Sequence, residues 1–297
     1  MTRTYLLLLL ATLFWGGTAV AGKLVLQDVP PLTAGVLRYG ITVLLLLLLF
    51  RSQLPSPWAL RTRDRWLLVW IGIFGTFLNH TFFFLALSYA PAAHGALIPS
   101  TTSPIWTLLL AARRGQERVG GLQIVGMGLC LAGVVLVVHP ARVLTGEGLG
   151  VLLGDGLFLI GGMAWGVYSY LSAMAMRRLS AVTTLVFGMG VGTLLLIPLA
   201  LTERPWATVH LAHASAWGAL AFLVGACTLL ALLWWNIALA RVGAGRTALF
   251  TNLVPLFGLL FSWLLLGERL APIQLLGGLL SVAGVVACQR PARRTGN

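Results

Sequence analysis

Apolar residues run along this chain in stretches of about 17–25 residues, a length that spans a bilayer as a helix. The stretches lack the alternation of apolar and polar residues that marks membrane β-strands. Short links separate them, and several links contain Pro or Gly. The pattern therefore predicts an all-α integral membrane protein with ten transmembrane helices. The predicted spans are residues 5–26, 32–50, 66–88, 92–112, 119–138, 150–176, 182–201, 215–239, 246–266 and 271–289.

The second half of the chain repeats the first at a constant offset, which indicates an internal duplication. The recurring positions are Pro104 as Pro255, Glu117 as Glu268, Gln123 as Gln274, Gly126 as Gly277, and residues 132–135 as 283–286. The sequence therefore predicts a single membrane domain over residues 1–297, built from a five-helix repeat at 1–145 and a second at 146–297. Because each repeat holds an odd number of spans, the two lie inverted in the membrane, a plan found in transporters.

Composition and charge agree with this prediction. Hydrophobic residues make up 59% of the chain and charged residues 9%, against about 25% charged residues in soluble domains. The net charge of +13 does not indicate a nucleic-acid partner, because the basic residues are spread over short links. With a cytoplasmic N-terminus, 15 of the 20 Lys and Arg residues fall in cytoplasmic links and 4 in outer links, while Arg38 lies within a span. We therefore expect both termini to be cytoplasmic.

Short motifs in both halves resemble those of EamA-type members of the drug/metabolite transporter superfamily. The first and sixth predicted spans share a Trp-Gly pair, at Trp15 and Trp165, and the second span holds Arg38. The sequence Gly-Glu-Arg-Leu at residues 267–270 leads into the last span, whereas the first half has Gln116 in place of that Gly. The resemblance to the family covers essentially the whole chain. Within the family, the chain is also similar, by a weaker match, to the bacterial aromatic amino-acid exporters.

This resemblance implies a multi-pass secondary transporter in the bacterial cytoplasmic (inner) membrane. Its expected partners are a small-molecule substrate and the lipid bilayer, with no cofactor and no nucleic acid. The expected activity is export of small metabolites, foremost amino acids including aromatic and other apolar ones, by alternating access around a cavity at the midplane. The sequence does not distinguish a monomer from an oligomer.

Polar residues near the middle of a span are predicted to line this cavity, because polar groups are costly in lipid. The residues of this kind are Asn79 and His80 in the third span, Ser100 and Thr101 in the fourth, and Asn252 in the ninth. Pro104 and Pro255 follow at matching places in the two halves and are predicted to kink their helices. The alternative is that His80 serves helix packing and that the hydroxyls bond back to their own helices.

Three aromatic residues and one arginine complete the predicted substrate site. Trp15 and Trp165 fall near mid-membrane, where an indole N–H needs a polar partner, and Tyr168 lies one turn from Trp165. They could stack on an apolar side chain of a substrate or pack between helices. Arg38 could bind a substrate carboxylate with two parallel hydrogen bonds. It could equally extend to the outer membrane surface or pair with a backbone carbonyl.

Acidic residues are predicted at helix starts rather than at mid-membrane. Glu117, Asp155 and Glu268 each lie near the N-terminal end of a predicted span, where a carboxylate suits the helix dipole. Only His80 is then placed to relay protons, so the sequence favours facilitated export over the alternative, a proton-coupled drug/metabolite antiporter. A channel would be expected to repeat a charged or carbonyl-lined filter, and a membrane enzyme needs a catalytic constellation. His210 and His213 lack a third ligand, so we expect no metal site.

Overall fold

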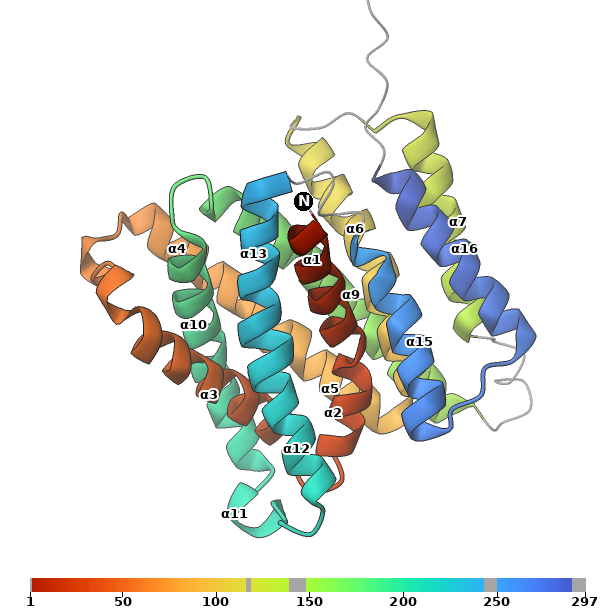
Figure 1. Cartoon of the computed structure of the whole chain (residues 1–297), viewed down its shortest axis with the longest axis horizontal. Coiled ribbons are helices and arrows are strands. Elements are labelled where there is room, and N and C mark those ends of the chain that lie inside the picture. The colour runs from red at the N-terminus through yellow and green to blue at the C-terminus, as the bar shows by residue number, and fades with distance from the viewer. Residues whose placement is uncertain (1, 116–118, 139–147, 243–249, 290–297) are drawn as a thin grey trace, which may run out of the picture.

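A computed structural model describes residues 2–115, 119–138, 148–242 and 250–289, and these residues form a bundle of helices without strands (Figure 1). The all-helical prediction is therefore confirmed for this part of the chain. The α-helices are α1 (Thr2–Gly16), α2 (Thr18–Val25), α3 (Pro31–Phe50), α4 (Thr62–Gly72), α5 (Asn79–Tyr89), α6 (Ala92–Arg113), α7 (Gly121–Val138), α9 (Leu149–Ala175), α10 (Ala181–Thr202), α11 (Pro205–Thr208), α12 (Ala214–Phe222), α13 (Ala231–Val242), α15 (Leu253–Leu266) and α16 (Pro272–Cys288). The short helical segments are η1 (Arg51–Gln53), η2 (Pro57–Ala59), η3 (Ile73–Leu78) and η4 (Leu223–Leu230).

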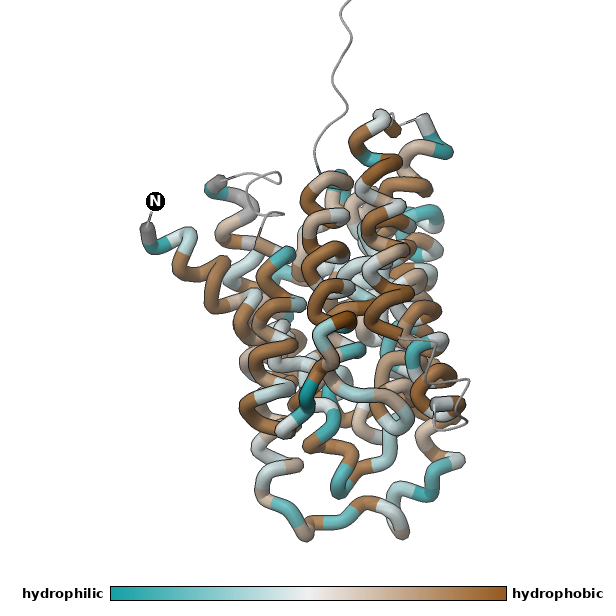
Figure 2. Tube along the Cα trace, turned by 90° about the vertical axis from the view of Figure 1, so that its right-hand side faces the viewer, coloured by the Kyte–Doolittle hydropathy of each residue, from teal (hydrophilic) through white to brown (hydrophobic). Residues whose placement is uncertain are grey.

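Seven helical stretches within the described residues are long and apolar enough to cross a membrane. They are Arg3–Val25, Pro31–Gln53, Thr62–Tyr89, Gly121–Val138, Leu149–Ala175, Ala181–Thr202 and Ala214–Trp235. The helices α15 and α16 are apolar but shorter. Leucines such as Leu48, which is 74% exposed, cover the outside of the bundle. Figure 2 shows hydrophobic residues along the helices and hydrophilic residues toward the connecting segments, as lipid contact requires.

The bundle has two ends, which we call the α11 end and the opposite end. The α11 end, at the bottom of Figure 1, also holds the starts of α3, α6, α12 and α16. The start of α1 and the end of α16 both lie at the opposite end. Helices consequently run up and down between the two ends, and the first described helix begins at the same end where the last one finishes.

The helices α7 and α16 cross so closely that their backbones touch. A methyl group added at Gly126 would lie 2.7 Å from the carbonyl oxygen of Gly284, and one added at Gly277 would lie 2.6 Å from that of Gly133. A shift of one repeat, from Gly126 to Gly277 and from Gly133 to Gly284, exchanges the two contacts. Small residues at such a crossing permit the close packing that holds membrane helices together.

Glutamines flank this crossing with the same symmetry. Gln274 donates from Nε2 to the carbonyl oxygen of Val137 at 2.9 Å, and Gln123 donates to that of Cys288 at 3.4 Å. Each glutamine also accepts from a backbone N–H three residues earlier, at Ala271 for Gln274. The contacts between α7 and α16 therefore occur in pairs that the sequence offset relates.

Candidate functional site

A cavity of about 510 Å³, including the part that opens outward, lies among helices from both halves of the chain. The lining combines aromatic rings, hydroxyl groups and one guanidinium with apolar side chains. The lining residues are Trp15, Arg38, Tyr39, Ile71, Gly75, Thr76, Trp165, Tyr168, Thr184, Leu185, Met189, Cys227, Thr228 and Leu232.

Two π-helical segments line this cavity and supply polar groups to it. Gly75 and Thr76 lie in η3, and Cys227 and Thr228 lie in η4, which occupies the matching place in the second half. A π-helix widens the turn and frees backbone groups, and such segments are frequent at functional sites. The carbonyl oxygen of Cys227 accepts the indole N–H of Trp15 at 2.9 Å. A backbone carbonyl of η4 thus holds one of the aromatic walls of the cavity.

Arg38 contributes the one charged side chain among the lining residues given above. It is 7% exposed, and its Nε donates to the hydroxyl of Thr228 at 3.3 Å. Its Cζ lies 5.1 Å from the ring centroid of Tyr39, a cation–π contact. The side chain is therefore held at the cavity wall and does not extend to the end of the bundle.

Aromatic residues surround the cavity in pairs. The rings of Trp165 and Tyr168 lie 4.6 Å apart between centroids, and those of Trp15 and Trp235 lie 4.9 Å apart. The Tyr168 ring also covers Gly75, where a side chain of any size would collide with it. These pairs fix the ring planes, so the cavity offers a preformed apolar surface for the body of a substrate.

The sequence-predicted site residues therefore separate into two groups. Trp15, Arg38, Trp165 and Tyr168 all line the cavity. The other five, which bond or pack elsewhere in the bundle, are Asn79, His80, Ser100, Thr101 and Asn252.

His80 lies behind the wall of the cavity, 2% exposed. Its ring packs against Tyr39, with centroids 4.5 Å apart, and against Phe84. Its Nε2 has no hydrogen-bond partner among the described residues. Its neighbour Asn79 donates to the carbonyl oxygen of Gly161 at 3.0 Å. His80 is thus close enough to support Tyr39 without itself touching the cavity.

The hydroxyls of α6 bond to their own helix. Ser100 donates to the carbonyl of Ala96, and Thr101 donates to that of Leu97 at 2.7 Å. The helix α6 continues through Pro104, which lies in its interior.

The ninth predicted span differs from α6 in the partner of its polar side chain and in the position of its proline within the helix. Asn252 donates to the side chain of Gln289 at 3.1 Å. Pro255 lies in the first turn of α15, and a turn at Asn252 separates this helix from the helical residues Phe250 and Thr251.

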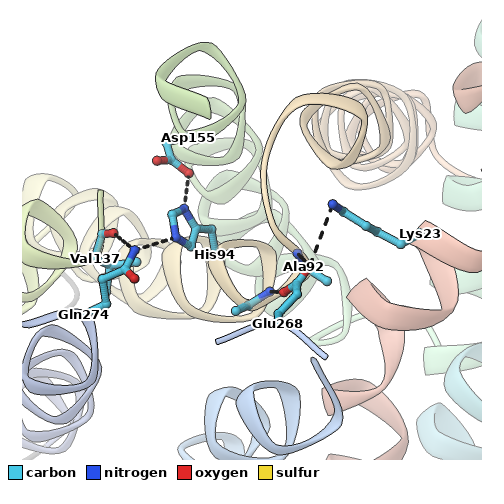
Figure 3. A network of polar contacts seen from close by, with 8 residues as sticks. Lys23, Ala92, His94, Val137, Asp155, Glu268 and Gln274 are labelled. Carbon is cyan, nitrogen blue, oxygen red and sulfur yellow. Dashed lines mark hydrogen bonds and ion pairs between the residues drawn. The ribbon is translucent and has the colours of Figure 1, made fainter. Parts of the chain in front are cut away.

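A buried polar network joins the start of α6 to α9 and α16 and, through the bond of Gln274 to Val137, to α7 (Figure 3). His94 of α6 contacts Asp155 of α9 through Nδ1 at 2.7 Å and Gln274 of α16 through Nε2 at 3.0 Å. The N–H of Ala271 donates to Oε1 of Gln274, so Nε2 of that amide is the donor to His94. The Nε2 of His94 therefore accepts, and its Nδ1 carries the proton that it donates to the Asp155 carboxylate.

Glu268 caps the start of the same helix. Its carboxylate accepts from the backbone N–H groups of Ala92 and Ala93 at 2.8 and 2.9 Å, and Lys23 lies 3.8 Å away (Figure 3). The prediction that Glu268 stabilises the start of its own helix is wrong, because α16 begins at Pro272. A helix that starts after a proline lacks a side-chain cap of its own, so a carboxylate from a remote loop satisfies its free N–H groups.

Glu203 caps α3 in the same manner at the α11 end. It accepts from the backbone N–H groups of Leu32 and Thr33 at 2.9 and 2.7 Å. Nearby, Asp28 accepts from the ring and the backbone N–H of His213, at 2.6 and 2.8 Å. Carboxylates thus fasten the α11 end of the bundle at several points.

Asp28 makes the folding stability of the protein depend on pH. Burial raises the pKa of its carboxyl, but the hydrogen bonds from His213 and the charges of His213 and His210 lower it by more, so the pKa falls below its usual range. The native protein then binds fewer protons than the unfolded chain near pH 4. Asp28 therefore contributes stability above the unfolded pKa of about 3.9, and this contribution is lost as the pH falls through the lower native pKa.

We expect Asp28→Asn to lower the unfolding temperature at pH 5–7 by an amount that shrinks below about pH 4. Unfolding midpoints of the purified protein in detergent between pH 3 and 7 measure this difference. In a His213→Ala background, which removes the ring partner and keeps the backbone N–H donor, Asp28→Asn should cost less than it does in the wild type. A difference from wild type that stays constant down to pH 3 would contradict the assignment.

The fold and the cavity together define a multi-pass helical membrane protein with an internal polar and aromatic site. The sequence profile of the EamA-like transporter family matches residues 2–139 and again residues 152–288. The chain belongs to this family.

Relatives and a solved structure agree with this membership. An uncharacterised transporter of Bacillus subtilis, YyaM, is 27% identical over 95% of this chain and 92% of its own length. A protein of Escherichia coli named a probable amino-acid metabolite efflux pump is 27% identical over 94% of this chain and 92% of its own length. A crystal structure with 22% identity superposes with a TM-score of 0.66 over 99% of both chains, which supports the fold.

Proposed function

We propose that this protein is a secondary transporter that exports small metabolites, foremost amino acids with aromatic and other apolar side chains, by alternating access around the cavity. The observation that carries the proposal is a cavity with a buried arginine, aromatic walls and hydroxyls on two matching π-helical segments. Arg38 would bind the substrate carboxylate, and Trp15, Trp165 and Tyr168 would hold its side chain. The name of the Escherichia coli relative, a probable amino-acid metabolite efflux pump, also supports amino acids as the substrate class.

Ten membrane spans in two inverted five-helix repeats would supply the alternating movement. The two matches of the family profile and the paired contacts between α7 and α16 support this arrangement. The excess of Lys and Arg in one set of links supports cytoplasmic termini in a bacterial inner membrane. Under this proposal the α11 end faces outward.

Facilitated export is the mode that the cavity favours. No carboxylate is among its lining residues within the described chain, and His80 lies behind the wall. One observation favours proton coupling as the second candidate: the buried pair of His94 and Asp155, since such pairs serve proton relays in membranes.

Flux from liposomes tests the proposal and separates the two modes. Purified protein in liposomes loaded with phenylalanine should release it with neither a pH gradient nor a membrane potential. Flux that needs a proton gradient, and loses that dependence in His80→Ala or Asp155→Asn, would establish the second candidate instead. We expect Trp165→Ala to lower the rate roughly 2- to 10-fold, because one aromatic contact contributes about 0.5–1.5 kcal/mol. The matched control, Trp206→Ala, removes a 74% exposed indole and should leave the rate unchanged.

A further inference from the structure

Arg38 is a buried cation whose charge no described residue balances. No carboxylate within the described part of the chain forms an ion pair with it. Its Nε bond to Thr228 uses one of five N–H donors, and neither Nη group makes a hydrogen bond to another described residue. A charge held away from water is costly unless an opposite charge meets it. Among the described residues, none therefore supplies the cavity with a negative charge that balances Arg38.

The rest of the cavity wall supplies no anion. Trp15, Trp165 and Tyr168 offer ring faces, and Thr76 and Thr228 offer hydroxyls. Hydroxyls can accept a hydrogen bond from an ammonium group, but they do not neutralise its charge. The five described acidic residues all make contacts outside the lining: Asp28, Asp64, Asp155, Glu203 and Glu268.

We propose that the preferred substrates of this cavity are organic monoanions, a carboxylate on an apolar or aromatic body without an amine, ahead of zwitterionic amino acids of the same shape. This inference rests on the proposed transport function and specifies its substrate class. A monoanion neutralises Arg38, and its two oxygens match the two Nη groups of the guanidinium. A zwitterion delivers the same carboxylate but leaves the site with one positive charge. An amine without a carboxylate adds a second positive charge beside Arg38 and is rejected.

Three ligands that share a phenyl ring and a short chain separate these cases by charge alone. They are 3-phenylpropionate with one negative charge, phenylalanine as a zwitterion, and 2-phenylethylamine with one positive charge. We expect 3-phenylpropionate to bind about tenfold tighter than phenylalanine, and 2-phenylethylamine to bind weakest. Calorimetric titration of the detergent-purified protein at pH 7 measures the three affinities. Binding is the better readout here, because the neutral form of a weak acid crosses lipid unaided and would obscure flux.

Variants at Arg38 test whether the arginine sets this order. Arg38→Gln should bring the affinities for 3-phenylpropionate and phenylalanine close together, whereas Arg38→Lys, which keeps the charge, should retain the order. Arg51→Gln removes an exposed arginine outside the cavity and serves as the matched control. The wild-type series decides the question even where a substitution at Arg38 prevents folding.

Two results would overturn the inference. Phenylalanine that binds as tightly as 3-phenylpropionate, or an order that survives Arg38→Gln, would show that charge balance does not select the ligand. If phenylalanine binds as tightly and also flows from liposomes, the transport proposal stands and the monoanion preference fails. If the charge order holds while none of the ligands is transported, the transport proposal fails instead.

Discussion

Gly126→Ala is expected to destabilise the protein by about 1–3 kcal/mol, although it adds a single methyl group to a helix. That methyl would lie 2.7 Å from the carbonyl oxygen of Gly284 and 2.8 Å from the backbone nitrogen of Cys288. Neither backbone atom can rotate aside, so α7 and α16 must separate along their crossing. Membrane helices gain little from apolar burial against one another, so lost close packing is not compensated. The unfolding temperature in detergent measures the effect. It is the temperature at which heating removes half of the monodisperse protein.

Two further glycines make this experiment specific. Gly128 lies on the same helix with no atom within 4 Å of an added methyl, so Gly128→Ala should leave stability unchanged or raise it slightly. Gly277→Ala places its methyl 2.6 Å from the carbonyl oxygen of Gly133, in surroundings that match those of Gly126. We therefore expect it to cost as much as Gly126→Ala. Unequal effects of Gly126→Ala and Gly277→Ala would contradict the equivalence of the two repeats.

The elements that the sequence predicts well are those determined by local composition. Long apolar runs produce helices because every backbone group must bond within its own segment in lipid. The offset between Gly126 and Gly277 also anticipates the paired contacts of α7 and α16, since equal sequences meet equal surroundings across a two-fold crossing. Trp15, Arg38, Trp165 and Tyr168 reach the cavity, as their mid-span positions suggest.

The remaining predictions depend on how each helix is rotated about its axis, which a single sequence of nearly uniform apolar residues does not reveal. Ser100 and Thr101 bond to their own helix, and Asn79 faces a carbonyl of α9 rather than the cavity. The π-helical segments were not predicted, because a change of hydrogen-bond register leaves no side-chain signature beyond a small polar pair such as Gly75-Thr76. These segments depend on packing from both halves at once.

The pairing of His94 with Asp155 also escapes sequence analysis. The two residues lie 61 positions apart on helices that meet only in the fold. At the same offset as the repeat, their counterparts in the sequence are Gly245 and Thr4, so the pair is not part of the duplicated pattern. The sequence gives one indication: His94 and Asp155 each lie near the start of a helix, and the residue at the matching position of the other repeat is uncharged. A polar pair that joins the two halves without a repeat-related counterpart indicates a role that symmetry of the scaffold does not require.

His94→Ala is expected to be the most destabilising substitution in this network, at about 3–5 kcal/mol. It leaves the Asp155 carboxylate, which is 1% exposed, without its partner, and Oδ2 of that residue already has no partner among the described residues. Asp155→Asn keeps an oxygen that can accept from His94 and removes the charge, so we expect a cost of about 1 kcal/mol. Unfolding temperatures in detergent at pH 7 give both values.

The double variant His94→Ala with Asp155→Asn provides the decisive comparison. A neutral amide is less costly to bury unpaired than a carboxylate, so the second substitution should restore part of the stability that the first removes. His210→Ala removes an exposed imidazole near the α11 end and should change stability little. If the double variant is as unstable as the sum of the two single variants, the charge of Asp155 is not what His94 compensates. Partial rescue would show that His94 compensates the buried charge of Asp155.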